Sequence, residues 1–157
     1  MARTTYFTIT LKGTKEAQAY IKKQVQRLND VRNVLARIAQ DFYRVERDWF
    51  DSQGGGRWRP LSPRYAQRKA RFFPGKKILR RTDKMYREFT GQTRHFRVTR
   101  HALDINVLGV RYWLAHEEGT NRIPQREVIS PWVAQRVDTW HQMVTDHIHV
   151  NIRTGNR

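Results

Sequence analysis

A long run of apolar side chains at helical spacing constrains the fold of this chain more than any other feature. Apolar residues recur every three or four positions from Ile21 to Trp49, the spacing that places side chains on one face of a helix. The pattern predicts a core helix, or two collinear helices broken near Asn29–Asp30. A coiled-coil seam would need strict heptads, whereas this stripe departs from them and contains bulky aromatic residues. Packing of the helix on a sheet is therefore favoured.

Shorter elements are predicted before and after this helix from capping, turn and alternation signals. They are a strand Thr5–Leu11 before a helix N-cap at Thr14, a helix from Ser62–Pro63 to about Phe72, a helix Lys84–Phe89 capped by Thr82 or Asp83, strands Thr93–Val98 and Ala102–Leu108 joined as a hairpin near Arg100–His101, one or two helical turns Tyr112–Glu118 ended by Gly119, a loop Arg122–Val128, and a helix from Ser130–Pro131 to about Asp146. The order predicts an α+β fold, in which a long N-terminal helix or helix pair packs on a small, mostly antiparallel sheet, with short helices and a C-terminal helix.

Two segments are predicted to be mobile. Three successive glycines, Gly54–Gly56, follow the long helix, so we expect the loop 53–57 to be mobile. The end of the chain, 147–157, has few apolar anchors and is predicted to be an extended, polar and mobile tail. The whole chain, 1–157, is expected to form a single α+β domain, because this length can bury one core.

The absence of cysteine excludes disulfides, thiol nucleophiles and cysteine–zinc clusters. The first residues, MARTTY, lack the apolar core and cleavage site of a signal peptide. No window approaches the roughly 18 consecutive apolar residues of a membrane-spanning helix. We therefore expect a soluble protein that is made in the cytoplasm and has no membrane partner.

Positive charge is concentrated between Arg57 and Arg87. This basic segment contains twelve Lys or Arg and one acidic residue, Asp83, so it carries +11 of the net charge of +17. Such a charge predicts a polyanion or an acidic protein face as the partner. Interspersed aromatic and aliphatic residues predict a folded surface and not a disordered arm. The candidate contacts to a partner or to DNA are Arg57, Trp58, Arg59, Arg64, Arg68, Lys69, Lys76, Lys77, Arg80, Arg81 and Lys84.

Trp58 is the tryptophan best placed to stack on a nucleic-acid base, because it lies between two arginines after the glycine loop. The other interpretation is that Trp58 is a core or interface anchor, as most tryptophans are. The sequence contains no RNA-recognition motif, KH signature, zinc finger or basic zipper. The hypothesis of sequence-independent nucleic-acid binding therefore depends on the positive charge and on Trp58.

No group of residues points to catalysis. His116 and Glu117 have the side chains of an acid, a base or a metal ligand, but neighbouring side chains on a helix point in different directions. His147 and His149 would share one side of a strand, with His141 upstream, yet no carboxylate-rich motif accompanies them. The fourteen acidic residues are scattered, which disfavours a magnesium-dependent nuclease. We expect no enzymatic activity, no cofactor and no metal; a metal-dependent nuclease built on these residues ranks last.

Several residues have predicted local roles. Trp58, Pro60 and Leu61 form a stiff entry to the helix that Ser62 caps. Gly119 suits a left-handed helix C-cap. Arg126 is expected either to bind carbonyls or a carboxylate with two nitrogens, or to remain a solvated surface charge.

Four short segments stand in a fixed order within about residues 31–140. They are Trp58–Tyr65 (WRPLSPRY) followed by Lys69, then Lys77–Thr82 (KILRRT), Tyr112–Gly119 (YWLAHEEG) and Ile123–Val128 (IPQREV). In this order and spacing they resemble the phage virion morphogenesis family, the tail-completion or head–tail joining proteins of tailed bacteriophages and prophages. The chain departs from the family's pattern at Asp83, where glycine is usual, at Met85–Tyr86 and at Val128–Ile129.

The resemblance implies a small α+β protein that forms a ring or cap at the end of the tail tube and allows head joining. The implied partners are further copies of the chain in a homo-oligomeric ring, the tail tube or terminator protein, head-completion proteins and packaged DNA in the channel, within the tail or neck of the virion. No catalytic residue is implied. The motif positions with structural roles would be Pro60, Leu61, Ser62, Tyr65, Thr82, Tyr112, His116, Gly119 and Arg126. The alternative function is sequence-independent nucleic-acid binding.

Overall fold

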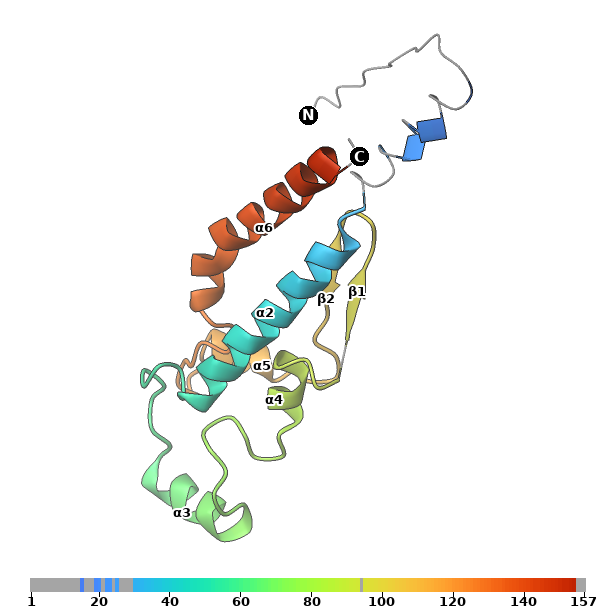
Figure 1. Cartoon of the computed structure of the whole chain (residues 1–157). Helices are drawn as coiled ribbons and strands as arrows, with labels where there is room; N and C mark the ends of the chain where they lie inside the picture. Colours follow the sequence, from blue (N-terminus) through green and yellow to red (C-terminus); the bar gives the residue numbers. More distant parts are fainter. Residues whose placement is uncertain are drawn as a thin grey trace.

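A computed structural model of the chain describes residues 15, 19, 20, 22, 23, 25, 30–93 and 95–154, with side chains as far as residue 150. Its elements are α2 (Arg32–Asp51), α3 (Pro63–Phe72), α4 (Lys84–Phe89), β1 (Phe96–Val98), β2 (Leu103–Ile105), α5 (Trp113–Glu117) and α6 (Trp132–Thr154). The predicted α+β class is confirmed, because the long helix α2 lies against a small antiparallel sheet (Figure 1). The predicted strand Thr5–Leu11 and the N-cap Thr14 fall outside the described residues. No helix in the described part is long and apolar enough to cross a membrane.

Helix α2 buries part of the predicted apolar stripe. Ile38, Val45 and Trp49 are buried, whereas Leu35 and Phe42 are half-buried. Val34, which the stripe did not include, is fully buried on the same side of the helix. Residues 30 and 31 are not helical, so of the two predicted alternatives the break near Asn29–Asp30 is confirmed and the single uninterrupted helix is wrong. Burial of this stripe is the main contribution of α2 to the core.

Helix α6 runs antiparallel to α2 and lies beside it (Figure 1). Asp41 of α2 accepts hydrogen bonds from Arg136 Nε at 2.8 Å and from Trp140 Nε1 at 2.9 Å. Burial raises the pKa of Asp41, but these two donors and Arg44 outweigh it and lower the pKa to about 2. The ionised carboxylate is therefore a fixed link between the two long helices.

The extended tail predicted for 147–157 is wrong as far as Thr154, because α6 continues through that residue. No glycine or proline interrupts the chain between Pro131 and Gly155, so nothing local ends the helix. His147 Nε2 lies 3.1 Å from the carbonyl oxygen of Asp30, which holds this part of α6 to the start of α2. On a helix His147 and His149 point in different directions, so the pairing expected on a strand does not occur.

The core is built around aromatic rings at the end of α2. Its buried members are Trp49, Phe50, Trp58, Met85, Tyr86, Phe89, Val110 and Val128. The indole N–H groups of Trp49 and Trp58 both donate to the carbonyl oxygen of Glu127, at 2.9 and 2.8 Å. Trp58 is only 6% exposed, so base stacking by Trp58 is a wrong interpretation and the anchor interpretation holds. Two hydrogen bonds to one carbonyl fix the loop 122–128 against α2.

The glycine loop forms a tight left-handed turn. Four successive residues, Gln53 to Gly56, have φ of 54°, 72°, 59° and 79°, and the turn is closed by hydrogen bonds from Gly54 N to Trp49 O at 2.8 Å and from Trp58 N to Gln53 O at 3.3 Å. A Cβ atom on Gly54 would collide with the Trp58 ring. Glycine is needed here because L side chains disfavour this conformation and because the indole approaches so closely. The mobility of 53–57 stays a prediction.

The remaining short elements lie where they were predicted, but the strands are shorter, Phe96–Val98 and Leu103–Ile105, and the predicted side-chain caps do not form. Strands β1 and β2 pair antiparallel, with Arg97 opposite Asp104, and Gly119 follows α5 with a φ of 76°. Ser62 occupies the N-cap of α3, although its hydroxyl makes no capping hydrogen bond. Asp83 precedes α4 in the left-handed conformation and likewise does not cap through its side chain.

Candidate functional site

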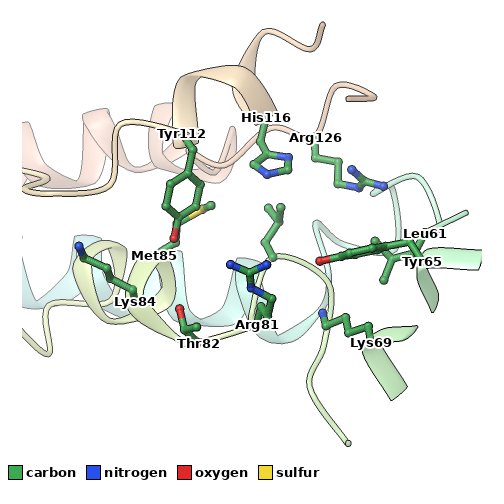
Figure 2. Close-up of a pocket in the computed structure, with 11 residues that line it drawn as sticks. Leu61, Tyr65, Lys69, Arg81, Thr82, Lys84, Met85, Tyr112, His116 and Arg126 are labelled. Atoms are coloured by element: carbon green, nitrogen blue, oxygen red, sulfur yellow. The ribbon is translucent and has the colours of Figure 1, made fainter. Parts of the chain in front are cut away.

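The four motif segments meet at one cavity of about 420 Å³, which we call the basic pocket (Figure 2). Figure 2 shows Tyr112, His116 and Arg126 on one side, with Arg81, Thr82 and Lys84 opposite them. Residues from α3 and the segment before it close a third side. The complete lining is Leu61, Tyr65, Lys69, Leu79, Arg81, Thr82, Lys84, Met85, Tyr112, His116 and Arg126. Sequence reasoning did not name Leu79 or Met85 as site residues, although Leu79 lies within the motif segment Lys77–Thr82 and Met85 lies three residues after it.

Arg126 is a buried organiser of this pocket. It is 4% exposed, and it donates from Nε to Arg59 O at 2.9 Å and from Nη2 to Pro60 O at 3.2 Å. The prediction that Arg126 binds carbonyls with two nitrogens is therefore confirmed. Burial lowers the pKa of Arg126, and the charge of Arg59 acts in the same direction. The two hydrogen bonds fix the chain that leads into α3.

Lys69 is the buried residue of α3. Its Nζ donates to the carbonyl oxygen of Lys77, which ties the helix to the segment that follows it. Burial lowers the pKa of Lys69; the charge of Asp83 opposes this effect and that of Arg126 adds to it. Lys69 is only 5% exposed and lines the pocket, so it is not on the outer surface of the basic segment. Its contact to a partner stays a prediction.

His116 points into the pocket (Figure 2). Its Nδ1 atom is buried and has no hydrogen-bond partner among the described residues. Burial lowers the pKa of His116, and the charge of Arg126 lowers it further. Glu117 faces elsewhere, since its Oε2 accepts from the backbone N–H groups of Val128 and, at 3.1 Å, Ile129. The described residues contain no group of three His, Asp or Glu that could hold a metal ion.

Several cations of the basic segment are neutralised within the molecule. Lys76 and Arg80 both pair with Asp83. Arg80 also pairs with Asp51 at 2.8 Å and lies 3.6 Å from the centroid of the Tyr86 ring. Lys77 and Arg57 make longer ion pairs, to Asp51 at 3.7 Å and to Glu127 at 3.6 Å. These four residues are therefore weaker candidates for a partner than the sequence suggested, because part of their charge is already used.

Helix α3 projects from the rest of the molecule (Figure 1). It carries a row of exposed arginines. Arg64, Arg68 and Arg71 stand at i, i+4 and i+7, which places them on one face of the helix. We call them the arginine stripe. No described carboxylate pairs with any of the three. Sequence reasoning named the first two and missed Arg71, although the helical spacing would have identified it.

A second hollow, of about 800 Å³, adjoins the basic pocket. It lies between residues 59–62 and the loop 120–124, and it shares Leu61, Tyr65, His116 and Arg126 with the pocket. Pro60, Ile123 and Pro124 give it apolar walls. The exposed cations that line these hollows are Arg59, Arg81, Lys84 and Arg122. The first three are predicted contacts, whereas sequence reasoning missed Arg122.

In comparisons with protein-family models, curated proteins and solved structures, nothing matches the chain. The resemblance to phage morphogenesis proteins therefore depends on the four motif segments and their order.

Proposed function

We propose that the chain is a structural assembly protein of a tailed phage, a tail-completion or neck component that forms a ring at the head–tail junction. One observation carries the proposal: each of the four segments that resemble the family supplies residues to the basic pocket. Segments matched by chance would be scattered over the molecule. Their convergence is what a shared binding face requires.

The charge of this face indicates the partner. Helix α3 supplies Tyr65 and Lys69 to the pocket and also carries the arginine stripe. A partner that approaches α3 therefore meets exposed positive charge first and the recessed pocket second. Complementary charge speeds association and excludes wrong partners. We propose an acidic face of the tail tube, the terminator protein or the head-completion protein as this partner.

Exposed aromatic and aliphatic side chains support self-assembly. Tyr65, Phe72, Tyr112 and Leu114 are between 40% and 60% exposed, and two of them line the pocket. Aromatic residues are enriched in protein interfaces. A closed ring needs two different surfaces of the chain in contact with each other. In this proposal the protein acts by assembly in the virion and uses no catalytic residue or cofactor.

The second candidate function is sequence-independent nucleic-acid binding, and the arginine stripe favours it. Three exposed arginines in a row can contact successive phosphates. The burial of Trp58 weighs against this candidate, because it removes the aromatic residue that was expected to stack on a base.

A triple charge reversal, Arg64→Glu with Arg68→Glu and Arg71→Glu, separates the two candidates. All three side chains are exposed, so the variant should remain folded. The matched control reverses Arg37, Arg47 and Arg111, which are exposed arginines outside the basic segment. In an assembly extract that lacks the protein, the stripe variant should fail to complete tails and the control variant should succeed.

Completion of tails by the stripe variant at the normal rate would contradict the proposal. Duplex binding at two salt concentrations tests the second candidate. If the stripe contacts phosphates, the unmodified protein should bind all sequences alike, and the logarithm of affinity should fall with the logarithm of salt by about 0.9 per phosphate contact. The variant should then lose this binding and this slope.

A further inference from the structure

Two buried cations in the basic pocket, Arg126 and Lys69, form no ion pair with a described carboxylate. The charge of Asp83 acts on Lys69 from beyond ion-pair distance, and Asp83 itself pairs with Lys76 and Arg80. Arg126 and Lys69 are 4% and 5% exposed, and their recorded hydrogen bonds go to the backbone carbonyls of Arg59, Pro60 and Lys77. A carbonyl satisfies an N–H group but carries no net charge. Removing a charge from water without an ion-pair partner is unfavourable. The pocket is thus an unusual place for two positive charges.

Further donors face the same space. Arg81 and Lys84 line the pocket and are exposed at its mouth, and Thr82, Tyr65 and Tyr112 bring hydroxyl groups. The buried Nδ1 of His116 has no partner within the described chain. No lining residue is acidic. Charge-assisted hydrogen bonds to an oxygen anion would satisfy these groups together.

We propose that the basic pocket binds a carboxylate, carried on an acidic side chain of a partner protein. A bound carboxylate gives Arg126 and Lys69 an ion-pair partner and accepts from the donors at the mouth. Burial and the charge of Arg126 lower the pKa of His116, which shows that the described surroundings of this ring are positive.

The shape of the site favours a protein segment over a nucleic-acid backbone. The most buried cations lie at the bottom of a recess, where a carboxylate on a flexible aliphatic stem can reach them. The adjoining hollow extends the recess to a groove with apolar walls from Pro60, Ile123 and Pro124. Such walls fit the stem and the neighbouring residues of an extended peptide. Duplex phosphates are presented on a wide, rigid surface, and they suit the exposed arginine stripe instead.

That the carboxylate belongs to a protein rests on the proposed function, whereas the anion site rests on the pocket alone.

The test is a titration of the full chain with N-acetylglutamate amide, followed by NMR of the histidine ring nitrogens. His116 is assigned with a His116→Gln variant. N-acetylglutamine amide is the neutral control ligand, and inorganic phosphate is a separate arm.

We expect saturable binding of N-acetylglutamate amide at about 1 mM, the affinity of a small ligand held by a few charged contacts. The ring signals of His116 should shift, and its pKa should rise, because a negative charge stabilises the protonated ring. The neutral control ligand should cause neither change. An Arg81→Gln/Lys84→Gln variant should weaken binding at least about tenfold. Arg64→Gln/Arg68→Gln, which removes the same charge outside the pocket, should change it less than about twofold.

Three results would overturn the inference: no saturable binding, an equal loss in both double variants, or binding of phosphate without binding of the carboxylate. Failure of the proposed function is distinguishable from each of them. If the carboxylate binds as expected but the arginine-stripe variant completes tails, the carboxylate site is supported and the assembly function is contradicted. If the carboxylate does not bind but the stripe variant fails to complete tails, the carboxylate site is contradicted and the assembly function is supported.

Discussion

Replacing Glu46 by glutamine should remove a pH dependence from the stability of this protein. Glu46 lies on α2 and is 0% exposed. Its Oε1 accepts a hydrogen bond from the backbone N–H of Ser130 at 2.9 Å, while Oε2 has no partner among the described residues. Burial raises the pKa of Glu46 to about 8; the charge of Glu117 adds to this effect and the Ser130 N–H opposes it. The carboxyl group is therefore protonated in the folded protein at neutral pH.

The sign and size of the effect follow from the two pKa values. Below pH 4.5 the carboxyl group is protonated in both the folded and the unfolded chain, so it does not change the free energy of unfolding with pH. Between pH 4.5 and about 8 only the folded chain keeps the proton, so the free energy of unfolding falls as the pH rises. At about 1.4 kcal/mol per unit of pKa, the loss by pH 8 has an upper limit of about 5 kcal/mol. Glutamine keeps the acceptor for Ser130 and does not ionise, so Glu46→Gln should avoid this loss.

Urea unfolding followed by tryptophan fluorescence at pH 5 and pH 8 measures the difference. We expect Glu46→Gln to exceed the unmodified protein in stability by a few kcal/mol at pH 8 and by much less at pH 5. Asp48→Asn is the control, because it removes an exposed carboxylate from the same helix and should show no such change with pH. A variant that gains nothing between pH 5 and pH 8 would refute the reasoning.

Three further substitutions test the packing around the site. Gly54→Ala should lower the melting temperature more than Gly56→Ala: both positions have positive φ, which costs an L residue about 1–2 kcal/mol, but only a Cβ on Gly54 meets the Trp58 ring. Arg80→Gln should lower the free energy of unfolding by about 1 kcal/mol or more, because Arg80 pairs with Asp51 and Asp83, whereas Arg64→Gln should change it by less than about 0.5 kcal/mol in the same urea titration. Asp41→Asn should lower the free energy of unfolding by about 2 kcal/mol at pH 7, since the pKa of Asp41 is lowered from 3.8 to about 2. This loss should shrink as the pH falls from 4 to 2, and a loss that does not change with pH would contradict the prediction.

Local signals were sufficient to predict most of the helices and the hairpin. Three of these signals act within a few residues and are therefore visible in the sequence. They are the apolar spacing of α2, the proline at the start of α3 and Gly119 after α5. The end of α6 was missed because polar residues there remain helical, and the contact that holds this part of the helix, from His147 to the carbonyl of Asp30 just before α2, is distant in the sequence. Contacts between distant segments override local composition.

The candidate site was predictable in its charge and not in its arrangement. The density of Lys and Arg identified the basic segment, but the pairing of Arg80 with Asp51 depends on how α2 meets the loop after α3. The burial of Trp58 and Lys69 likewise depends on the turn at Gly54–Gly56 and on the carbonyl of Lys77. The residues that line the pocket are spread from Leu61 to Arg126 and meet only after the fold has formed. No spacing in the sequence could therefore show that they share a pocket.

Electron cryomicroscopy of the purified protein mixed with tail tubes shows directly whether a ring assembles. We expect a ring of this chain at one end of the tube, with helix α3 against a neighbouring protein and an acidic side chain of that neighbour in the basic pocket. Tubes with bare ends, or a ring in which α3 and the pocket face solvent, would contradict this expectation.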